Sequence, residues 1–201
     1  MIDNIIFDLG QVLIKVNLPT FVEQFRREFQ FTDKEMEHQI GDGAYESFMI
    51  GKITPAQFHQ LTCQYYQRNV SFEKFNAIWN SMLAGPVEGM AEIVEQLKKQ
   101  NFVLSLLSNT DPWHFEACVQ QLPWLSNFSR KFLSYELQMK KPDAEIYLTV
   151  AQLLKVSPEQ CLFIDDRLDN ILAAQALNFK TIHFSDASNL RHELGQIGIS
   201  V

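Results

Sequence analysis

The sequence has few cysteines, and none of them stands in a spacing that binds zinc or forms a redox pair. Its three cysteines are Cys63, Cys118 and Cys161, with no Cys-x-x-Cys pair. An odd number of widely separated thiols argues against a disulfide framework, so we expect reduced thiols and a cytoplasmic setting. Cys161 opens an apolar run, which predicts that its thiol is buried in the core.

Long hydrophobic runs and an excess of basic residues are also missing. No apolar run approaches the roughly 20 residues that cross a membrane, and no signal segment opens the chain, so we expect neither membrane insertion nor export. The 17 Lys and Arg residues are outnumbered by 24 Asp and Glu residues, which gives a net charge of −7. This balance argues against nucleic acid as a main partner, although a local cationic site can still bind an anionic small molecule.

The stretch over residues 5–13 is the first feature that points to chemistry. Residues 5–7 are apolar, β-branched or aromatic, and predict a buried strand that ends at Asp8. Open α/β sheets place their reactive groups at such strand ends. Gly10 is expected to let the backbone turn sharply and to let a ligand approach closely. The competing interpretation is an aspartate that only closes a turn.

Residues 15–87 show helical patterns only. Three phenylalanines recur every four residues near their start, at Phe21, Phe25 and Phe29. They predict a helix with one aromatic face, and Thr32 or Asp33 is expected to cap the helix that follows. The aromatic residues of the block favour the core of a small bundle over a cofactor site. Its position directly after Asp8 predicts a cap over a site.

From residue 88 onwards, predicted helices alternate with predicted strands. Apolar runs predict strands over residues 102–107, 132–134, 161–164 and 181–184. This alternation is typical of an α/β fold with a doubly wound parallel sheet. Residues 1–14 and 88–201 are therefore expected to form the core domain, and residues 15–87 the inserted helical cap domain.

Two polar stretches after the first strand have the chemistry of a phosphate site. Ser108 and Asn109 end a predicted strand and offer a hydroxyl, an amide and backbone N–H groups. Lys141, between Lys140 and Pro142, can supply a point charge beside a phosphate. The alternatives are a strand-end serine without a ligand and a solvated surface lysine.

Asp165 and Asp166 are adjacent acids at the end of another apolar strand. Their charges repel each other, so a nearby cation would offset a real cost. A hard cation such as Mg²⁺ suits an all-oxygen ligand set. Helix N-capping by either acid is the competing explanation.

Four ordered motifs together resemble those of the haloacid dehalogenase-like hydrolases. They are Phe-Asp-Leu-Gly-Gln-Val, Leu-Ser-Asn-Thr, Lys-Lys-Pro-Asp and Phe-Ile-Asp-Asp-Arg-Leu-Asp-Asn. The resemblance covers nearly the whole chain, including the helical block, and is nearest to the small bacterial sugar-phosphate phosphatases. It implies a Rossmann-like core, a mobile helical cap, and Mg²⁺-dependent hydrolysis of a small phosphate ester through an aspartyl-phosphate.

The resemblance also assigns roles to residues. Asp8 matches the catalytic nucleophile, and Lys141 matches the catalytic lysine that holds the nucleophile and the phosphoryl group. The implied substrate-binding positions are Leu9, Gly10, Ser108, Asn109 and Lys141. The implied metal ligands are Asp8, the main-chain carbonyl of Gly10, and Asp166. The roles of Asp165, Asp169 and Asn170 stay open, because Asn170 falls where many relatives have a second acid.

One departure from the family pattern concerns Gly10. Most phosphatases of the family have a second aspartate at this position, which acts as general acid and base. Its absence implies a leaving group that needs little protonation, or an acid supplied by substrate, water or the cap. An anomeric sugar phosphate such as glucose 1-phosphate leaves as a hemiacetal oxygen, which is more acidic than an ordinary alcohol. We therefore favour such substrates as a hypothesis.

Three other functions compete with a phosphatase. A metal-independent haloacid dehalogenase would use the same aspartate, but the pair Asp165 and Asp166 argues against it. A non-catalytic protein could have kept the fold and lost the acid at Gly10. A phosphoacceptor receiver domain would place its acid pair first and its acceptor later, which is the reverse of the order here. The oligomeric state and the substrate-selecting cap residues stay open.

Overall fold

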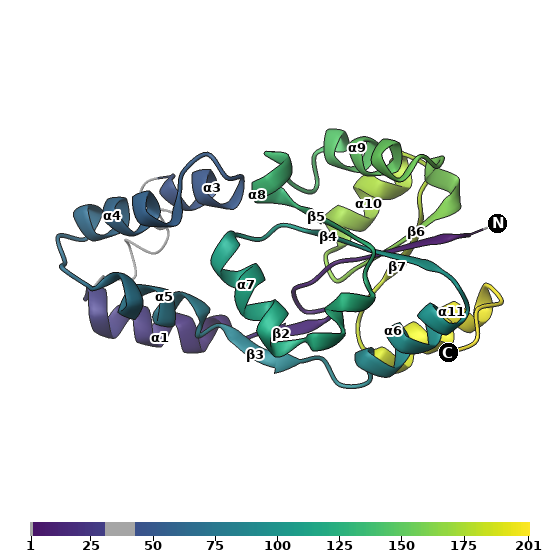
Figure 1. Cartoon of the computed structure of the whole chain (residues 1–201), viewed down its shortest axis with the longest axis horizontal. Coiled ribbons are helices and arrows are strands. Elements are labelled where there is room, and N and C mark those ends of the chain that lie inside the picture. The colour runs from purple at the N-terminus through teal and green to yellow at the C-terminus, as the bar shows by residue number, and fades with distance from the viewer. Residues whose placement is uncertain (1, 31–42) are drawn as a thin grey trace.

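A five-stranded parallel sheet forms the centre of the molecule (Figure 1). The computed structural model describes residues 2–30 and 43–201. The strand order is β5-β4-β1-β6-β7. The strands are β1 (Asn4–Phe7), β4 (Val103–Ser108), β5 (Arg130–Leu133), β6 (Cys161–Asp165) and β7 (Lys180–His183). This arrangement confirms the predicted parallel α/β fold, with strand ends that differ from the prediction by one or two residues.

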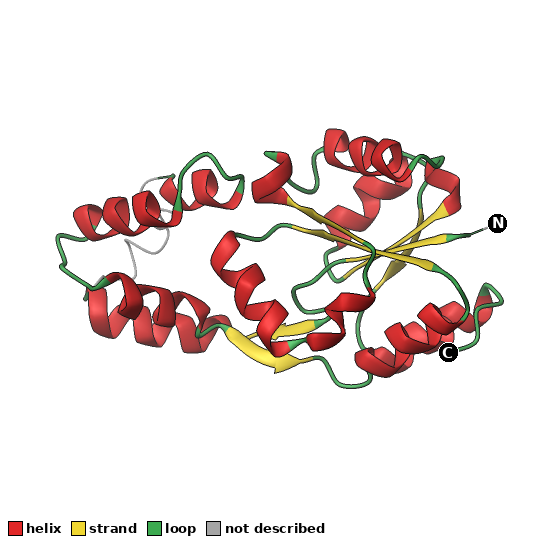
Figure 2. Cartoon of the chain, in the orientation of Figure 1, coloured by secondary structure: helices red, strands yellow, loops and turns green. Residues whose placement is uncertain are grey.

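Helices cover both faces of this sheet (Figure 2). They are α6 (Met90–Lys99), α7 (Pro112–Gln121), α8 (Ser134–Leu137), α9 (Ala144–Leu154), α10 (Leu168–Ala176) and α11 (Ala187–Gln196), with 3₁₀ turns η1 (Pro123–Asn127) and η2 (Pro158–Gln160). Ile5 and Phe7 of β1 pack with α6 and α11, whereas Ile6 packs with α9 and α10. Alternate side chains of a strand point to opposite faces, so a central strand covered on both sides is apolar throughout. The prediction that Cys161 is buried is confirmed.

Among the described residues, four further helices form an aromatic cluster at one end of the molecule. These cap helices are α1 (Leu18–Phe29), α3 (Ala44–Met49), α4 (Pro55–Tyr65) and α5 (Phe72–Asn80). The three phenylalanines of α1 are buried on one face, as their spacing predicts. Trp113 of α7 is buried in the same cluster and ties it to the sheet domain. Thr32 and Asp33 lie outside the described residues.

Two short strands join the cap helices to the sheet domain. β2 (Ile14–Val16) and β3 (Leu83–Pro86) pair antiparallel. The prediction that residues 15–87 are helical throughout is therefore wrong at both ends. The strands have three and four residues, too few for a two-residue period to stand out, and their pairing joins distant parts of the chain. The division into core and cap at residues 14 and 88 remains a prediction.

Across the described residues, each helix is too short or too polar to cross a bilayer.

Candidate active site

The predicted motifs meet at the C-terminal edge of the sheet. Phe7 pairs in register with Leu106 of β4 and with Ile164 of β6, so the residues that follow them lie at one level. The N–H of Asp8 donates to the carbonyl of Ile164 at 2.8 Å. Parallel strands bring their carboxyl ends together, and the sheet thereby places Asp8 beside the ends of β4 and β6.

Lys141 lies between two carboxylates at this edge. Its Nζ is 2.8 Å from Oδ1 of Asp8 and 2.7 Å from Oδ2 of Asp165. It also donates to the carbonyl of Leu107 at 2.9 Å. The residue is only 3% exposed, so the alternative of a solvated surface lysine is wrong. A buried ammonium with three oxygen partners has a fixed position, and here it faces Asp8.

Asn109 fixes the backbone of this lysine. Its Nδ2 donates to the carbonyl of Lys141 at 2.8 Å, and its Oδ1 accepts the N–H of Lys141 at 2.8 Å. The side-chain amide that the sequence suggested for phosphate is therefore engaged by the protein. Ser108 ends β4 and is buried, whereas its neighbour Asn109 is exposed; both line a cavity together with Leu9 and Gly10.

The two adjacent acids have different surroundings. Asp165 is fully buried; besides Lys141, it accepts hydrogen bonds from the N–H of Arg167 at 2.8 Å and from Nδ2 of Asn170 at 3.0 Å. Asp166 is half-buried and lines the cleft next to Asp8. Asp169 pairs with the exposed Arg167 at 2.7 Å, outside this network.

These contacts define the roles that the motif left open. Asp165 holds Lys141 in place directly, and Asn170 supports it by donating to Asp165. The alternative of side-chain capping is not seen, because α10 starts after Arg167 without a side-chain cap. Sequence reasoning missed the role of Asp165, since adjacent acids look equivalent until their burial is known.

The site carries an excess of negative charge. Burial is the main cause that raises the pKa of Asp8 to about 6, with Asp165 adding to it and Lys141 opposing it. Burial also raises the pKa of Asp166, with a further contribution from Asp165. Burial alone would lower the pKa of Lys141, but the two carboxylates beside it outweigh burial and raise it. One ammonium facing three carboxylates leaves net negative charge, which a divalent cation would offset.

The acids are close enough to share such a cation. Oxygens of Asp8, Asp165 and Asp166 all lie within 4.8 Å of one another. Asp165 already binds Lys141, Arg167 and Asn170, so Asp8 and Asp166 have the greater capacity left for a metal ion. This donor set fits Mg²⁺, which takes carboxylate and carbonyl oxygens.

The turn that follows Asp8 contains Gly10 and Gln11. The left-handed residue of the turn is Gln11, with φ 56°, and Gly10 is outside the positive-φ residues. Gln11 also holds β2, because its side chain donates to the carbonyl of Val16 and accepts the N–H of Val16. A Cβ at Gly10 would meet Val16 Cγ2 at 3.6 Å, an ordinary contact. Gly10 is expected to let the backbone turn sharply; the structure instead places the left-handed residue of this turn at Gln11.

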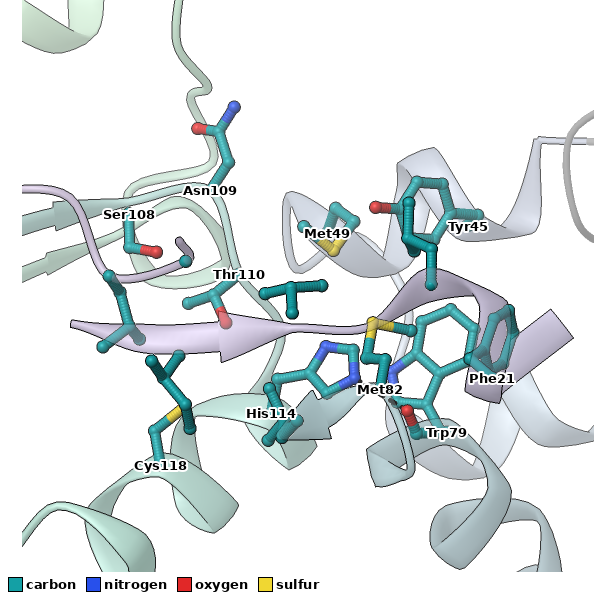
Figure 3. A pocket seen from close by; sticks show the side chains of 16 residues that line it. Phe21, Tyr45, Met49, Trp79, Met82, Ser108, Asn109, Thr110, His114 and Cys118 are labelled. Atoms are coloured by element: carbon teal, nitrogen blue, oxygen red, sulfur yellow. Dashed lines mark hydrogen bonds between the residues drawn. The ribbon is translucent and has the colours of Figure 1, made fainter. Parts of the chain in front are cut away.

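Two neighbouring cavities open at the site. The polar cleft, about 600 Å³, is bounded by Asp8, Lys141 and Asp166 and, from the cap, by Tyr45 and Glu46. The apolar cavity, about 370 Å³, lies between the cap helices and α7 (Figure 3). Gly10, Tyr45 and Met49 line both.

The cap touches the core at this place. Nζ of Lys140 is 2.6 Å from Oε2 of Glu46, and the Ser134 hydroxyl donates to the carbonyl of Met49 at 2.6 Å. Both contacts join α3 to segments that border the cleft. The structure thus places Tyr45 and Met49, which the sequence alone left unplaced, against the site, whereas Phe48 is buried in the cap cluster.

Comparisons with known proteins point to one family. A sequence model described as haloacid dehalogenase-like hydrolase matches residues 2–178. The chain is 26% identical to a D-ribitol-5-phosphate phosphatase of Bacteroides thetaiotaomicron, covering 96% of this chain and 97% of that protein. It is 28% identical to a sesquiterpene phosphatase of Aspergillus oryzae, covering 96% and 94%.

A solved structure supports the same grouping. A HAD family enzyme of Bacteroides thetaiotaomicron, in complex with magnesium and inorganic phosphate, has a TM-score of 0.84 and 30% identity, covering 94% of this chain and 99% of that one. The magnesium and phosphate in that relative agree with the two ligands predicted from the sequence.

Proposed function

Because this chain belongs to the haloacid dehalogenase-like hydrolases, we propose that it is a Mg²⁺-dependent phosphatase of the cytoplasm that hydrolyses small phosphate esters through an aspartyl-phosphate at Asp8. The relatives named as phosphatases confirm the predicted class, a phosphoric monoester hydrolase. The observation that carries the mechanism is the 2.8 Å contact of Asp8 with Lys141, in a cleft that Asp166 also lines.

Mg²⁺ would be held by Asp8, Asp166 and the main-chain carbonyl of Gly10. When bound there, it supplies positive charge that offsets the repulsion between a phosphate dianion and the Asp8 carboxylate. The acid cluster supports this assignment, because its oxygens lie within 4.8 Å of one another.

Lys141 supplies the protein's own positive charge. Its ammonium can contact both the nucleophile and a phosphoryl oxygen, and a fixed charge in a buried site needs little reorganisation during the reaction. Asp165 keeps this ammonium protonated and aimed at Asp8. Ser108 and Asn109, at the end of β4, line the adjoining apolar cavity, and Asn109 also lines the cleft that holds Asp8; the Ser108 hydroxyl and the backbone N–H groups here can bind phosphoryl oxygens.

The reaction takes place in two displacements. An oxygen of Asp8 attacks phosphorus, and the bond from phosphorus to the leaving oxygen breaks with its electron pair on that oxygen. Water then attacks the phosphorus of the acyl phosphate, which releases inorganic phosphate and restores the Asp8 carboxylate. The cap, held against the core near Met49, limits access of bulk water to the intermediate.

The absence of an acid at Gly10 restricts the leaving group. Gly10 supplies no acid, so esters with an acidic leaving oxygen are favoured, among them anomeric sugar phosphates such as glucose 1-phosphate. The name of the D-ribitol-5-phosphate phosphatase supports a phosphorylated carbohydrate as the substrate class, but its leaving oxygen is a primary alcohol and lends no support to the anomeric position.

A screen of phosphorylated metabolites and aryl phosphates with Mg²⁺, reading free phosphate, tests the function. We expect turnover that EDTA abolishes and that added Mg²⁺ restores. Phosphate release that is unaffected by EDTA would contradict the metal assignment. Halide release from 2-haloacids in EDTA would favour the dehalogenase, and absence of any turnover would favour a non-catalytic protein.

A further inference from the structure

The apolar cavity has walls of two origins. In Figure 3 the labelled cap residues Phe21, Tyr45 and Trp79 lie on one side, and Ser108 and Cys118 of the sheet domain lie on the other. Its volume of about 370 Å³ falls at the lower end of the range for small-molecule sites, enough for one ring with a short substituent.

Most polar groups in these walls already have partners within the protein. The Asp111 carboxylate accepts from Nε1 of Trp79 at 2.9 Å and lies 2.7 Å from Nδ1 of His114. The other ring nitrogen of His114 is 3.0 Å from the carbonyl of Trp79. Asn109 is engaged by the backbone of Lys141. A hydroxyl-rich group would therefore lose hydrogen bonds to water here and regain few.

Most of the remaining wall surface is apolar. Met49 and Met82, with flexible thioether side chains, lie near the centre of Figure 3, between the two walls. The Cys118 thiol stays neutral, because burial raises its pKa to about 12. Methionine and aromatic walls match apolar rings and chains.

The cavity adjoins the predicted phosphate site. Leu9, Gly10, Ser108 and Asn109 line it, and each of them is also a predicted substrate-binding residue. Gly10 borders the polar cleft too and has no side chain to separate the two spaces. A molecule whose phosphate lies at Asp8 can therefore extend its organic group into this cavity.

Tyr45 offers one polar contact at the rim. Among the described residues its hydroxyl has no hydrogen-bond partner, and burial raises its pKa to about 12, so it remains a donor. In Figure 3 this hydroxyl faces Met49. A single donor suits an ether or ester oxygen better than a ring of hydroxyls.

We propose that the apolar cavity binds the organic group of the substrate and that this group is apolar, an aryl or alkylaryl ring of a phosphate monoester. The inference rests on the proposed phosphatase function. It selects, among acidic leaving groups, an apolar one over the hydroxyl-rich glucose. Met49 is then a specificity residue, since its side chain borders both the cavity and the cleft.

A series of 4-alkylphenyl phosphates, from phenyl through 4-propylphenyl, tests the proposal with Mg²⁺ present. Alkyl substituents hardly change the acidity of the phenol, so the series varies apolar size at nearly constant leaving-group chemistry. We expect kcat/KM to rise about fourfold per methylene until the cavity is full. If phosphate is still released but kcat/KM stays constant or falls as the alkyl group lengthens, the proposal is overturned.

Met49→Gln and a matched control separate the cavity from general effects. Met49→Gln keeps the side-chain length and leaves the backbone carbonyl that Ser134 binds. We expect the variant to reduce the dependence of kcat/KM on alkyl length and to lower kcat/KM for the longest ester about tenfold. Leu61→Gln makes the same kind of change on the exposed face of α4. This control variant should keep the wild-type dependence of kcat/KM on alkyl length. The same dependence of kcat/KM on alkyl length in wild type and in Met49→Gln would contradict the role of Met49 in the cavity.

Binding of non-hydrolysable 4-alkylbenzylphosphonates, measured by calorimetry with Mg²⁺, distinguishes this inference from the proposed function. Affinity that rises with alkyl length supports the apolar cavity even if no ester is hydrolysed, in which case the phosphatase proposal fails alone. Affinity independent of alkyl length overturns the cavity assignment, whatever the enzyme hydrolyses.

Discussion

The ammonium of Lys141 and the carboxylate of Asp165 form a buried ion pair, with 2.7 Å between Nζ and Oδ2. Asp8 is the second partner of the same ammonium, at 2.8 Å. Under the proposed mechanism Asp8 becomes an acyl phosphate during each cycle, whereas Asp165 keeps its charge throughout. Asp165 therefore acts as a positioning residue that holds Lys141 in both states of the nucleophile.

Asp165→Asn should destabilise the protein and slow turnover. Removing one partner of a buried ion pair costs about 3 kcal/mol or more, although Asp8 still faces Lys141 here and reduces the loss. We expect a lower denaturant midpoint and a lower kcat for aryl phosphate. An unchanged midpoint would mean that the pair contributes nothing to folding.

Asp166→Ala should raise the Mg²⁺ concentration needed for half-maximal activity or abolish activity, because it removes a proposed charged ligand of the metal ion. The half-buried side chain of Asp166 takes no part in the ion pairs of Lys141, so the free energy of unfolding should change little. Asp169→Ala is the matched control, since Asp169 pairs with the exposed Arg167. If both variants had the wild-type Mg²⁺ titration, Asp166 would not be a ligand.

Asp8→Asn should lower turnover by at least about a thousandfold, as expected for loss of a nucleophile. The change is nearly isosteric, and Lys141 keeps its contact with Asp165, so the thermal midpoint should stay close to that of wild type. Phosphate release and a melting curve measure the two effects. A folded variant with most of its phosphatase rate would refute the covalent mechanism.

The rate should depend strongly on leaving-group basicity, because Gly10 supplies no proton. Each 1.4 kcal/mol of unrelieved charge on the leaving oxygen costs about tenfold in rate. Aryl and anomeric phosphates should be hydrolysed much faster than glucose 6-phosphate, at saturating substrate with chemistry rate-limiting. A flat dependence would mean that an acid is supplied from elsewhere, most plausibly the cap.

Gly10→Asp provides the converse test. The structure has room for a Cβ at Gly10, 3.6 Å from Val16 Cγ2. If the new carboxyl acts as the acid, the rate of hydrolysis of glucose 6-phosphate should rise relative to that of an aryl phosphate. Gly10→Ala controls for added bulk and should leave that ratio unchanged.

Stability should fall as the pH rises above the ordinary histidine range, because of His114. Burial lowers the pKa of His114, but Asp111 beside it outweighs burial and raises the pKa above 6.5. A raised folded-state pKa gives stability that is fully present below 6.5 and is lost as the pH rises through the folded pKa. We expect His114→Gln to flatten the dependence of Tm on pH above pH 6.5. Parallel curves of Tm against pH for wild type and His114→Gln would contradict this role of His114.

Local patterns in the sequence were enough to locate most strands and the four motifs. Strands at the centre of a parallel sheet are apolar on both faces, so Ile5, Phe7 and Ile164 mark their strands directly. Polar residues at the ends of such runs meet at one edge of the sheet, which is why Asp8, Ser108 and Asp166 could be predicted as neighbours.

Only the tertiary structure decided which of these polar groups are engaged by the protein. Asp165 and Asp166 look alike in sequence, and the difference between them arises from Lys141, 24 positions before Asp165. The pairing of β2 with β3 and the apolar cavity likewise depend on contacts between distant segments. Such contacts leave no periodic signal, because hydrophobic periodicity records which face of an element is buried and not which partner covers it.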